Sequence, residues 1–272
     1  IDEVGTVFHE FGHALHGLLS QCHYASVSGT SVVRDFVETF SQFNENWAFQ
    51  PELLAQYAIN DKGEVIPAEL VEKINNSLKF NQGFMTTELC AASILDMKWH
   101  ELESVDGIDI EAFEKKVCQE MGLIPEIGPR YRTTYFNHIF SSGYSAGYYG
   151  YLWAEVLDKD LFSMFEASGN VWNKELATKF RQTFLEKGGS EEPMKLFQLF
   201  AGRLPDNTAF LKRRVSISDI NCTLIYVIPK STGKPKEMHL DMSVGDTEFT
   251  SLDLFFDPKR KAYFFKGRQL AL

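Results

Sequence analysis

Apolar side chains recur every three or four residues along most of the chain, up to about residue 214. Positions spaced in this way share one face of an α-helix, so the pattern predicts a series of amphipathic helices. The clearest stripes comprise Val4, Val7, Phe8, Phe11, Leu15 and Leu18, then Phe36, Val37, Phe40, Phe43 and Trp47, and finally Leu152, Val156, Leu157, Leu161 and Phe165. We therefore expect residues 1–214 to form a helical region.

Proline and glycine mark the breaks between these helices. Pro51 and Pro67 suit the first turn of a helix, because proline has no backbone N–H to pair there. Gly107 and Gly169 lie between helical runs and suit helix ends. Residues 122–134 contain two glycines and two prolines, which predicts a long ordered loop.

The pattern changes after about residue 219. Short runs of β-branched and aromatic residues occupy positions 223–228, 248–256 and 262–265, and turn-forming residues separate them. The sequence thus predicts a mainly α fold with a small β-rich appendage at residues 219–272. No motif in this tail assigns it a chemical role.

Composition restricts the class of protein. The 272 residues include 27 basic and 37 acidic side chains, a net charge of −10, and 44% are hydrophobic. This apolar content supports a packed core and excludes a disordered chain. The acidic balance argues against a general nucleic-acid binder, which needs a basic face. No run approaches the roughly 18 uncharged apolar residues of a membrane span, so we expect no membrane insertion.

The cysteines are scattered and form no CxxC pair; they are Cys22, Cys90, Cys118 and Cys222. This spacing favours neither a disulfide framework nor a cysteine zinc site, and it suits a reducing, cytoplasmic location. The chain starts at Ile1 without an initiator methionine. An excised or truncated start has this appearance, so a lost targeting signal stays an open alternative.

The strongest chemical signal is an HExxH pattern formed by His9, Glu10 and His13 on a periodic helix. Residues four apart lie on one helix face, so both imidazoles can reach one metal ion. Glu10 is rotated away from them by about 100°, which suits a role on water rather than metal ligation. The alternative is an ordinary helix with two surface histidines.

A second helix carries a polar stripe formed by Asp35, Glu38, Gln42 and Glu45. Catalytic zinc takes three protein ligands, so a third ligand is expected from another element. A polar stripe on an otherwise apolar helix is costly to bury unless a metal and its ligands satisfy it. The alternative is that this stripe is simply the solvated face.

Together, HEFGHALH at 9–16, RDFVE at 34–38 and NENW at 44–47 resemble the thimet oligopeptidase and peptidyl-dipeptidase family of zinc metallopeptidases. The resemblance runs to about residue 214 and implies one Zn²⁺ per chain, with Glu38 as the third ligand beside the two histidines. Metal-bound histidines usually donate their second N–H to a carboxylate, and Glu45 and then Asp35 are the candidates. The family usually has proline where Phe40 stands, so we expect altered helix geometry just past Glu38.

A tyrosine-rich stretch at 135–153 reads as a short loop that opens a helix, with Tyr144, Tyr148 and Tyr151 on neighbouring turns. Phenols near a metal can donate hydrogen bonds to an oxyanion, whereas an arbitrary tyrosine cluster is more often a packed core. The resemblance implies that Tyr144, Tyr151 and His138 stabilise the tetrahedral intermediate and that Tyr148 lines the substrate cleft.

Arg130 and Arg132 precede this stretch and are candidates to bind a substrate carboxylate. A structural salt bridge is the alternative for either arginine. His16 lies on roughly the same face as His9, and we expect it to form a hydrogen bond near the site or to pack there, rather than to bind the metal. His23, His100 and His239 have no companions that indicate a site.

These observations predict a zinc metallopeptidase that cleaves short peptides, with Glu10 as general base acting on water. The family's long N-terminal part, which forms much of one cleft wall, has no counterpart here, so the chain corresponds to the catalytic half of a two-lobed helical enzyme. That absence predicts an exposed apolar surface and possible self-association, or pairing with the missing N-terminal half. Two alternatives stay open: a zinc-stabilised helical module that only binds a partner or peptide, and a structural domain in which HExxH has no role.

Overall fold

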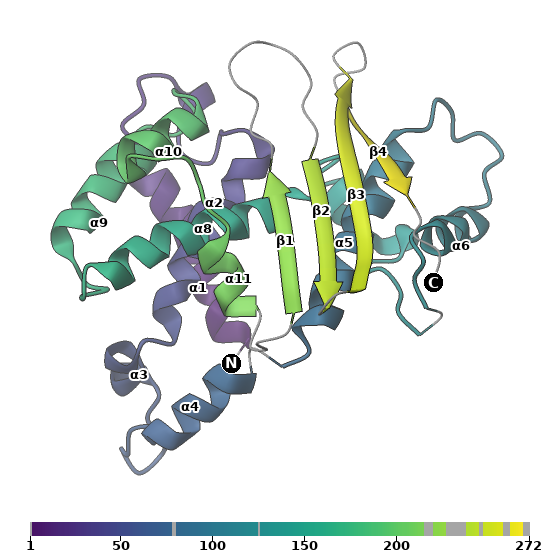
Figure 1. The fold of residues 1–272 in the computed structure, drawn as a ribbon. Helices are drawn as coiled ribbons and strands as arrows, with labels where there is room; N and C mark the ends of the chain where they lie inside the picture. The colour runs from purple at the N-terminus through teal and green to yellow at the C-terminus, as the bar shows by residue number, and fades with distance from the viewer. Residues whose placement is uncertain are drawn as a thin grey trace. The chain divides into compact units, whose positions relative to one another are not determined.

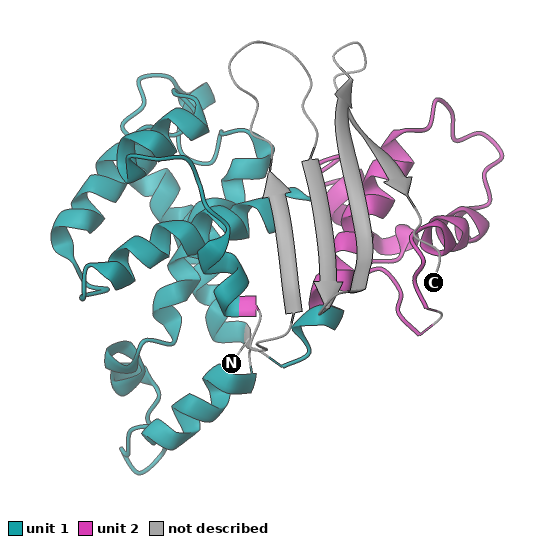
Figure 2. Cartoon of the chain, viewed as in Figure 1, with its two compact units in different colours: residues 1–84, 148–213 teal, residues 85–147, 214–272 magenta. Residues whose placement is uncertain are grey.

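In the computed structural model, the described residues are 2–77, 80–124 and 126–214, together with the backbone of four strands beyond residue 219. The chain divides into two compact units (Figure 2). Unit 1 comprises residues 1–84 and 148–213, and unit 2 comprises residues 85–147 and 214–272. The described residues are mainly helical, which confirms the predicted helical class.

Unit 1 holds eight of the described helices (Figure 1), the last of which ends one residue beyond the unit. They are α1 (Asp2–Leu18), α2 (Arg34–Ala48), α3 (Pro51–Tyr57), α4 (Ala68–Ser77), α8 (Gly150–Ala167), α9 (Lys174–Phe180), α10 (Pro193–Ala201) and α11 (Thr208–Arg214). Helix α2 packs against both α1 and α8. Pro51 occupies the first turn of α3 as predicted, and Pro67 directly precedes α4.

The core of unit 1 is built on the apolar face of α2. Phe36, Phe40 and Phe43 are each at most 6% exposed and pack with the buried apolar residues of α8. The ring of Phe43 stacks on that of Phe180 at 4.2 Å between centroids. Each such buried phenylalanine contributes about 1.5–3 kcal/mol of transfer free energy, so α2 is held firmly in the unit. The predicted core stripes of α2 and α8 are confirmed.

The apolar stripe of α1 behaves differently. Val7, Phe11 and Leu18 are 66%, 55% and 76% exposed. Helix α1 instead turns its face with Gly12 and His16 inward, and both residues are buried. The expectation of an exposed apolar surface is met on this helix, whereas self-association stays a prediction.

Phe40, which stands where the resembling family has proline, is only 3% exposed. Helix α2 runs through this position without interruption. The ring of Phe40 packs edge-on against the His16 ring, with 4.5 Å between centroids. A buried aromatic residue, which has the backbone N–H that proline lacks, therefore fits inside this helix, and its side chain becomes part of the core.

Unit 2 contains most of α5 (Gln82–His100), α6 (Ile110–Glu120), a 3-10 turn at Thr133–Tyr135 and the short helix α7 (Asn137–Phe140). Trp99 packs on Phe113 with 4.2 Å between ring centroids and donates from Nε1 to Thr133 Oγ1 at 3.0 Å. The described part of the predicted loop at 122–134 has no helix or strand before the 3-10 turn that begins at Thr133.

Beyond residue 219 the backbone runs through β1 (Ile220–Tyr226), β2 (Met238–Val244), β3 (Thr247–Asp257) and β4 (Ala262–Arg268), paired antiparallel in that order. The side chains of these strands lie outside the described residues. The division into a 1–214 region and a β-rich 219–272 tail therefore stays a prediction. Within the part of the chain that is described, no helix combines the length and apolar character needed to cross a membrane.

Candidate metal centre

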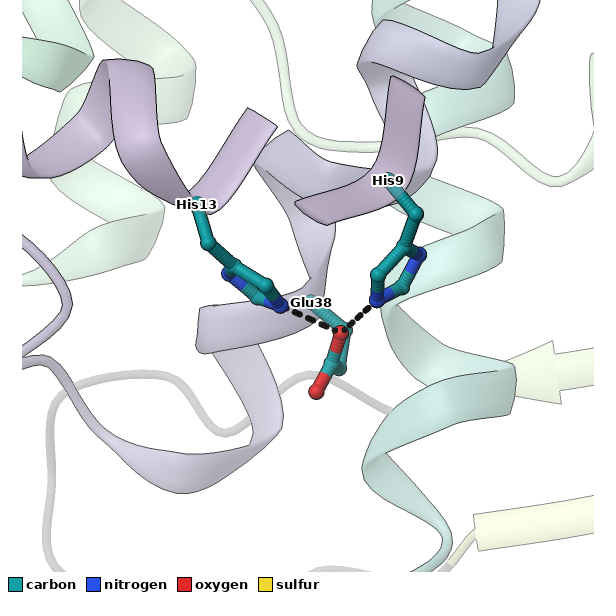
Figure 3. Close-up of side chains that lie close together, drawn as sticks. All are labelled: His9, His13 and Glu38. Carbon is teal, nitrogen blue, oxygen red and sulfur yellow. Dashed lines mark ion pairs between the residues drawn. The ribbon is translucent and has the colours of Figure 1, made fainter. Parts of the chain in front are cut away.

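Helices α1 and α2 bring His9, His13 and Glu38 together (Figure 3). The Oε2 atom of Glu38 lies 3.0 Å from Nε2 of His9 and 3.2 Å from Nε2 of His13. One potential ligand atom from each residue falls within 4.8 Å of the others. Both imidazoles thus point at the same carboxylate oxygen, one helical turn apart on α1, as the HExxH spacing predicts.

Gly12 allows this close approach of the two helices. A Cβ atom at this position would lie 2.6 Å from Cα of Ser41 and 2.7 Å from the carbonyl oxygen of Phe40. Both distances are well inside the van der Waals contact of about 3.5–4.0 Å between carbon atoms. The backbones of α1 and α2 therefore touch midway between the two histidines, opposite the turn that follows Glu38.

Two of the three side chains, Glu38 and His9, are held by further contacts. Glu38 is only 2% exposed, and Ser41 donates a hydrogen bond from Oγ to its Oε2 atom at 2.9 Å. His9 Nδ1 lies 2.6 Å from Oε1 of Glu45, which is the partner the sequence favoured for orienting an imidazole. The Nδ1 atom of His13 is buried, and it has no hydrogen-bond partner among the described residues. The contact between His9 and Glu45 is typical of metal-binding histidines, whose second ring nitrogen commonly meets a carboxylate.

Electrostatics in this cluster favour a cation. Burial on its own lowers the pKa of His9, but hydrogen bonds and charge attraction from Glu38 and Glu45 outweigh it and raise the pKa to about 10. Two carboxylates around two imidazoles therefore hold a proton strongly. A divalent cation would satisfy the same carboxylates.

The donor set fits zinc. Two imidazole nitrogens and one carboxylate oxygen are a known ligand set for catalytic zinc, which keeps its fourth position open. Ligands about 2.0–2.2 Å from a tetrahedral zinc lie roughly 3.3–3.5 Å apart. The two nitrogen–oxygen distances of 3.0 and 3.2 Å need only a small expansion to reach this geometry.

The structure gives Asp35 a different partner from the one expected. Tyr149 donates its hydroxyl to Oδ2 of Asp35 at 2.9 Å, so the orienting role on a histidine is not supported for Asp35. Burial raises the pKa of Asp35, and the Tyr149 bond opposes that shift. Gln42, another member of the α2 stripe, donates from Nε2 to the carbonyl oxygen of Tyr151 at 3.2 Å.

Sequence reasoning assigned no role to Gln42 and did not single out Tyr149. The available signals were the spacing of Gln42 on the polar stripe and the position of Tyr149 inside the tyrosine-rich stretch. Neither signal identifies a partner, because both contacts join segments more than a hundred residues apart.

The tyrosine stretch folds differently from the prediction. Helix α8 begins at Gly150, so Tyr151 lies in its first turn, whereas Tyr144 and Tyr148 precede the helix. Tyr148 is 3% exposed and its ring lies 5.1 Å from that of Tyr151, which favours the packing alternative over a cleft position. Tyr144 and His138 belong to unit 2, where their ring centroids are 6.1 Å apart.

The remaining candidates take varied positions. Glu10 is exposed on α1. Arg132 forms an ion pair with the buried Glu114, which supports the structural alternative for this arginine. Arg130 is exposed, and its backbone N–H donates to the carbonyl oxygen of Glu88 at 3.4 Å.

His16 is fully buried on Phe40, which favours the packing role over a hydrogen bond near the site. Among the described residues, neither of its ring nitrogens has a hydrogen-bond partner. Burial lowers its pKa to about 4, and the nearby His13 adds to this effect. His16 is therefore a neutral packing residue near the cluster.

A helical chain in which two histidines on one turn meet a glutamate from the next helix is typical of zinc metallopeptidases. Residues 1–216 match the model of peptidase family M3, so the chain belongs to this family of zinc enzymes. The resemblance seen in the sequence is thereby confirmed.

Individual relatives agree with this assignment. The chain is 43% identical over 217 residues to dipeptidyl carboxypeptidase of Escherichia coli (strain K12), an alignment that covers 78% of this chain and 32% of that protein. It is 40% identical over 214 residues to oligopeptidase A of the same organism, covering 78% of this chain and 31% of that protein. The organellar oligopeptidase A of Arabidopsis thaliana is 36% identical over 216 residues, covering 77% of this chain and 27% of that protein. The chain thus spans about a third of the length of these relatives.

Proposed function

We propose that this chain provides the zinc-binding and catalytic part of a metallopeptidase that hydrolyses peptide bonds in short peptides. The observation that carries the proposal is the convergence of His9, His13 and Glu38 from two helices onto one point. Membership of the M3 family and similarity to a dipeptidyl carboxypeptidase and oligopeptidases support peptides as the substrate class.

Bound zinc would supply a Lewis acid that acidifies water and polarises a carbonyl group. His9, His13 and Glu38 would hold the ion, and Glu45 would keep the His9 ring oriented through Nδ1. Glu10 would accept a proton from water and pass it to the leaving amine. It sits one residue after His9 on the same helix and is exposed, so solvent and substrate can reach it.

The tyrosines and His138 would act on the substrate rather than on the metal. Tyr151, in the first turn of α8, would donate its hydroxyl to the oxyanion that forms at the scissile carbonyl. The family resemblance implies the same purpose for Tyr144 and His138. Arg130, which is exposed, would bind a substrate carboxylate.

A second function is favoured by the exposed apolar side chains of α1, which include Val7 and Phe11. Exposed apolar side chains that lie together on a helix can form a contact surface for another chain. The chain would then act as a zinc-stabilised module that binds a peptide or a partner.

The deciding experiment measures zinc and turnover on the same samples. Metal analysis after mild dialysis should give one zinc per wild-type chain and much less for Glu38→Ala. A quenched short peptide should be cleaved by wild type, and Glu10→Gln should lower the rate by about 10²–10⁴-fold with zinc retained. Glu3→Gln is the matched control, because Glu3 is also an exposed acid on α1.

The outcomes separate the two functions. Zinc binding without cleavage by wild type supports the binding module and overturns the peptidase. Equal cleavage by wild type and Glu10→Gln contradicts the role of Glu10. Less than one zinc per wild-type chain overturns both functions.

A further inference from the structure

The polar stripe of α2 has a partner at every position. Glu38 faces both histidines and Glu45 faces His9. The other two members of the stripe, Asp35 and Gln42, face the segment that opens α8. One face of a single helix thus contacts the metal cluster and the tyrosine segment, and all of these residues belong to unit 1.

Three contacts join α2 to the segment Tyr149–Tyr151. Tyr149 donates its hydroxyl to Asp35, and Gln42 donates its side-chain amide to the carbonyl oxygen of Tyr151. Between them, a Cβ atom at Gly150 would lie only 3.0 Å from Cα of Asp35, so the two backbones touch there. These three contacts hold the first turn of α8 at Asp35 and Gln42 of α2. The two residues lie about one helical turn before and after Glu38.

The orientation of the Gln42 amide is fixed by this arrangement. A carbonyl oxygen only accepts hydrogen bonds, so the NH₂ group of Gln42 must face Tyr151. Its Oε1 atom is buried and has no hydrogen-bond partner among the described residues. Among the described residues, the bond to Tyr151 is the only hydrogen bond of this side-chain amide. Because a buried polar atom without a partner costs free energy, the Gln42 side chain depends on this one bond.

We propose that Asp35 and Gln42 are positioning residues that lock the Tyr149–Tyr151 segment to the helix that carries Glu38. Apolar packing and the hydrogen bond from Asn46 to Asp158 hold the later turns of α8 on α2. Without further contacts, the first turn would stay free to slide or rotate by a fraction of an ångström. Two hydrogen bonds and one backbone contact remove that freedom. The hydroxyl of Tyr151 then keeps a constant place relative to the metal cluster.

This inference rests on the proposed function for its consequence, because a displacement of about 1 Å in a catalytic group can lower a rate by about a hundredfold. The positioning of Tyr151 by Asp35 and Gln42 does not depend on whether the chain cleaves peptides. Zinc binding at Glu38 should be sensed by Tyr151 through the shared helix, whether or not the chain cleaves peptides.

The test uses the full chain with 3-fluorotyrosine incorporated at position 151 and followed by ¹⁹F NMR with and without zinc. Wild type should give one narrow line that moves when zinc is added. Gln42→Met, which keeps the volume but removes the donor, should broaden or split this line and weaken its response to zinc. Zinc affinity should stay within about twofold, since Gln42 touches none of the three candidate ligands.

Two further variants keep the test decisive if Gln42→Met is unstable. Tyr149→Phe removes the bond to Asp35 and should broaden the same line, whereas Asp35→Asn retains an acceptor and should resemble wild type. Gln50→Met is the matched control, because Gln50 also donates to a backbone carbonyl on α2, that of Asn46 at 2.9 Å. It should leave the Tyr151 line unchanged.

Peptide cleavage supplies a second readout. Gln42→Met should lower kcat by about 10–100-fold with KM changed less than threefold, because the ground-state substrate contacts are intact. A Tyr151 line in Gln42→Met that matches wild type in width and zinc response would overturn the inference. Failure of wild type to cleave would overturn the proposed function alone, since the NMR comparison needs no turnover.

Discussion

Replacing Gly12 by alanine tests the geometry of the metal centre most directly. The new methyl carbon would lie 2.6 Å from Cα of Ser41 and 2.7 Å from the carbonyl oxygen of Phe40. Because both neighbours are backbone atoms, they cannot rotate away, and α1 must move from α2 by about 1 Å to restore normal contact. Metal sites tolerate ligand errors of about 0.2 Å, so this movement should separate the histidines from Glu38.

The size of the effect follows from two opposing contributions. Overpacking of this kind costs about 1–3 kcal/mol, and the better helix propensity of alanine returns about 0.5–1 kcal/mol. We expect a net loss of about 1–2 kcal/mol in metal-free stability, or about 2–8 °C in Tm. Zinc should also bind at least about tenfold more weakly, which corresponds to about 1.4 kcal/mol.

Thermal unfolding with and without a chelator, and zinc competition against a chelating dye, measure the two quantities. Gly5→Ala is the matched control on the same helix, because a Cβ atom there meets nothing within 4 Å. It should stabilise the chain slightly and leave zinc binding unchanged. If Gly12→Ala and Gly5→Ala behave alike in both assays, the close crossing of α1 and α2 does not hold the site together.

Three further predictions concern charged groups away from the metal cluster. The buried Asp96 raises the pKa of His100 through a 2.8 Å contact, so the stability from this pair is full below about pH 6.5 and is lost as pH rises through the folded pKa. His100→Gln should therefore destabilise the chain more at pH 6 than at pH 9 in urea unfolding. Burial raises the pKa of Asp158 to about 6, so its contribution is lost as pH rises from about 4 to 6; Asp158→Asn should remove about 3 kcal/mol of this pH dependence. Arg203 makes two hydrogen bonds to the carboxylate of Asp160, which is 2% exposed, and Arg203→Met should cost about 2–4 kcal/mol in the same assay.

Each of these three variants has a control on the surface. His23→Gln and Asp61→Asn change exposed residues of the same type and should leave the pH dependence of unfolding unchanged. Lys73→Met removes an ion pair whose two side chains are 68% and 78% exposed, and should cost less than about 0.5 kcal/mol. A control that matches its buried counterpart would contradict the corresponding explanation.

The two histidines could be predicted from the sequence because their chemistry is local: His9 and His13 share a helix face by spacing alone. The polar stripe of the second helix offered several acids, and only the family resemblance singled out Glu38 as the third ligand. The burial of α1 could not be predicted in the same way. Part of its apolar stripe (Val7, Phe11 and Leu18) is exposed, whereas the small residue Gly12 packs tightly against α2. Close backbone fit, and not hydrophobicity alone, therefore decides which face of this helix turns inward.

The tyrosine segment shows a similar limit. Periodicity placed Tyr144 and Tyr148 on the same helix as Tyr151, but the turn at Ala146, with φ of 51°, and the start of α8 at Gly150 exclude them from it. The partner of Asp35 could not be predicted either, because a carboxylate on the polar stripe of α2 can accept a hydrogen bond from a histidine or from a tyrosine far away in the sequence. Contacts between segments far apart in the sequence decide where a helix begins and which partner a side chain binds. The spacing of residues along the chain does not predict these contacts.

The position of α2 explains why one helix can serve both purposes. Its phenylalanines anchor it in the core, and its polar stripe lies where α1 and α8 both approach it. A buried carboxylate such as Glu38 is costly unless a positive group stands beside it. Glu38 and Glu45 raise the pKa of His9 to about 10, so a protonated His9 would supply such a positive group. The Glu38 carboxylate at the crossing of α1 and α2 is therefore stabilised by a positive charge beside it. The backbone contact at Gly12 holds the two helices close enough for one proton or one cation to meet this carboxylate and both histidines.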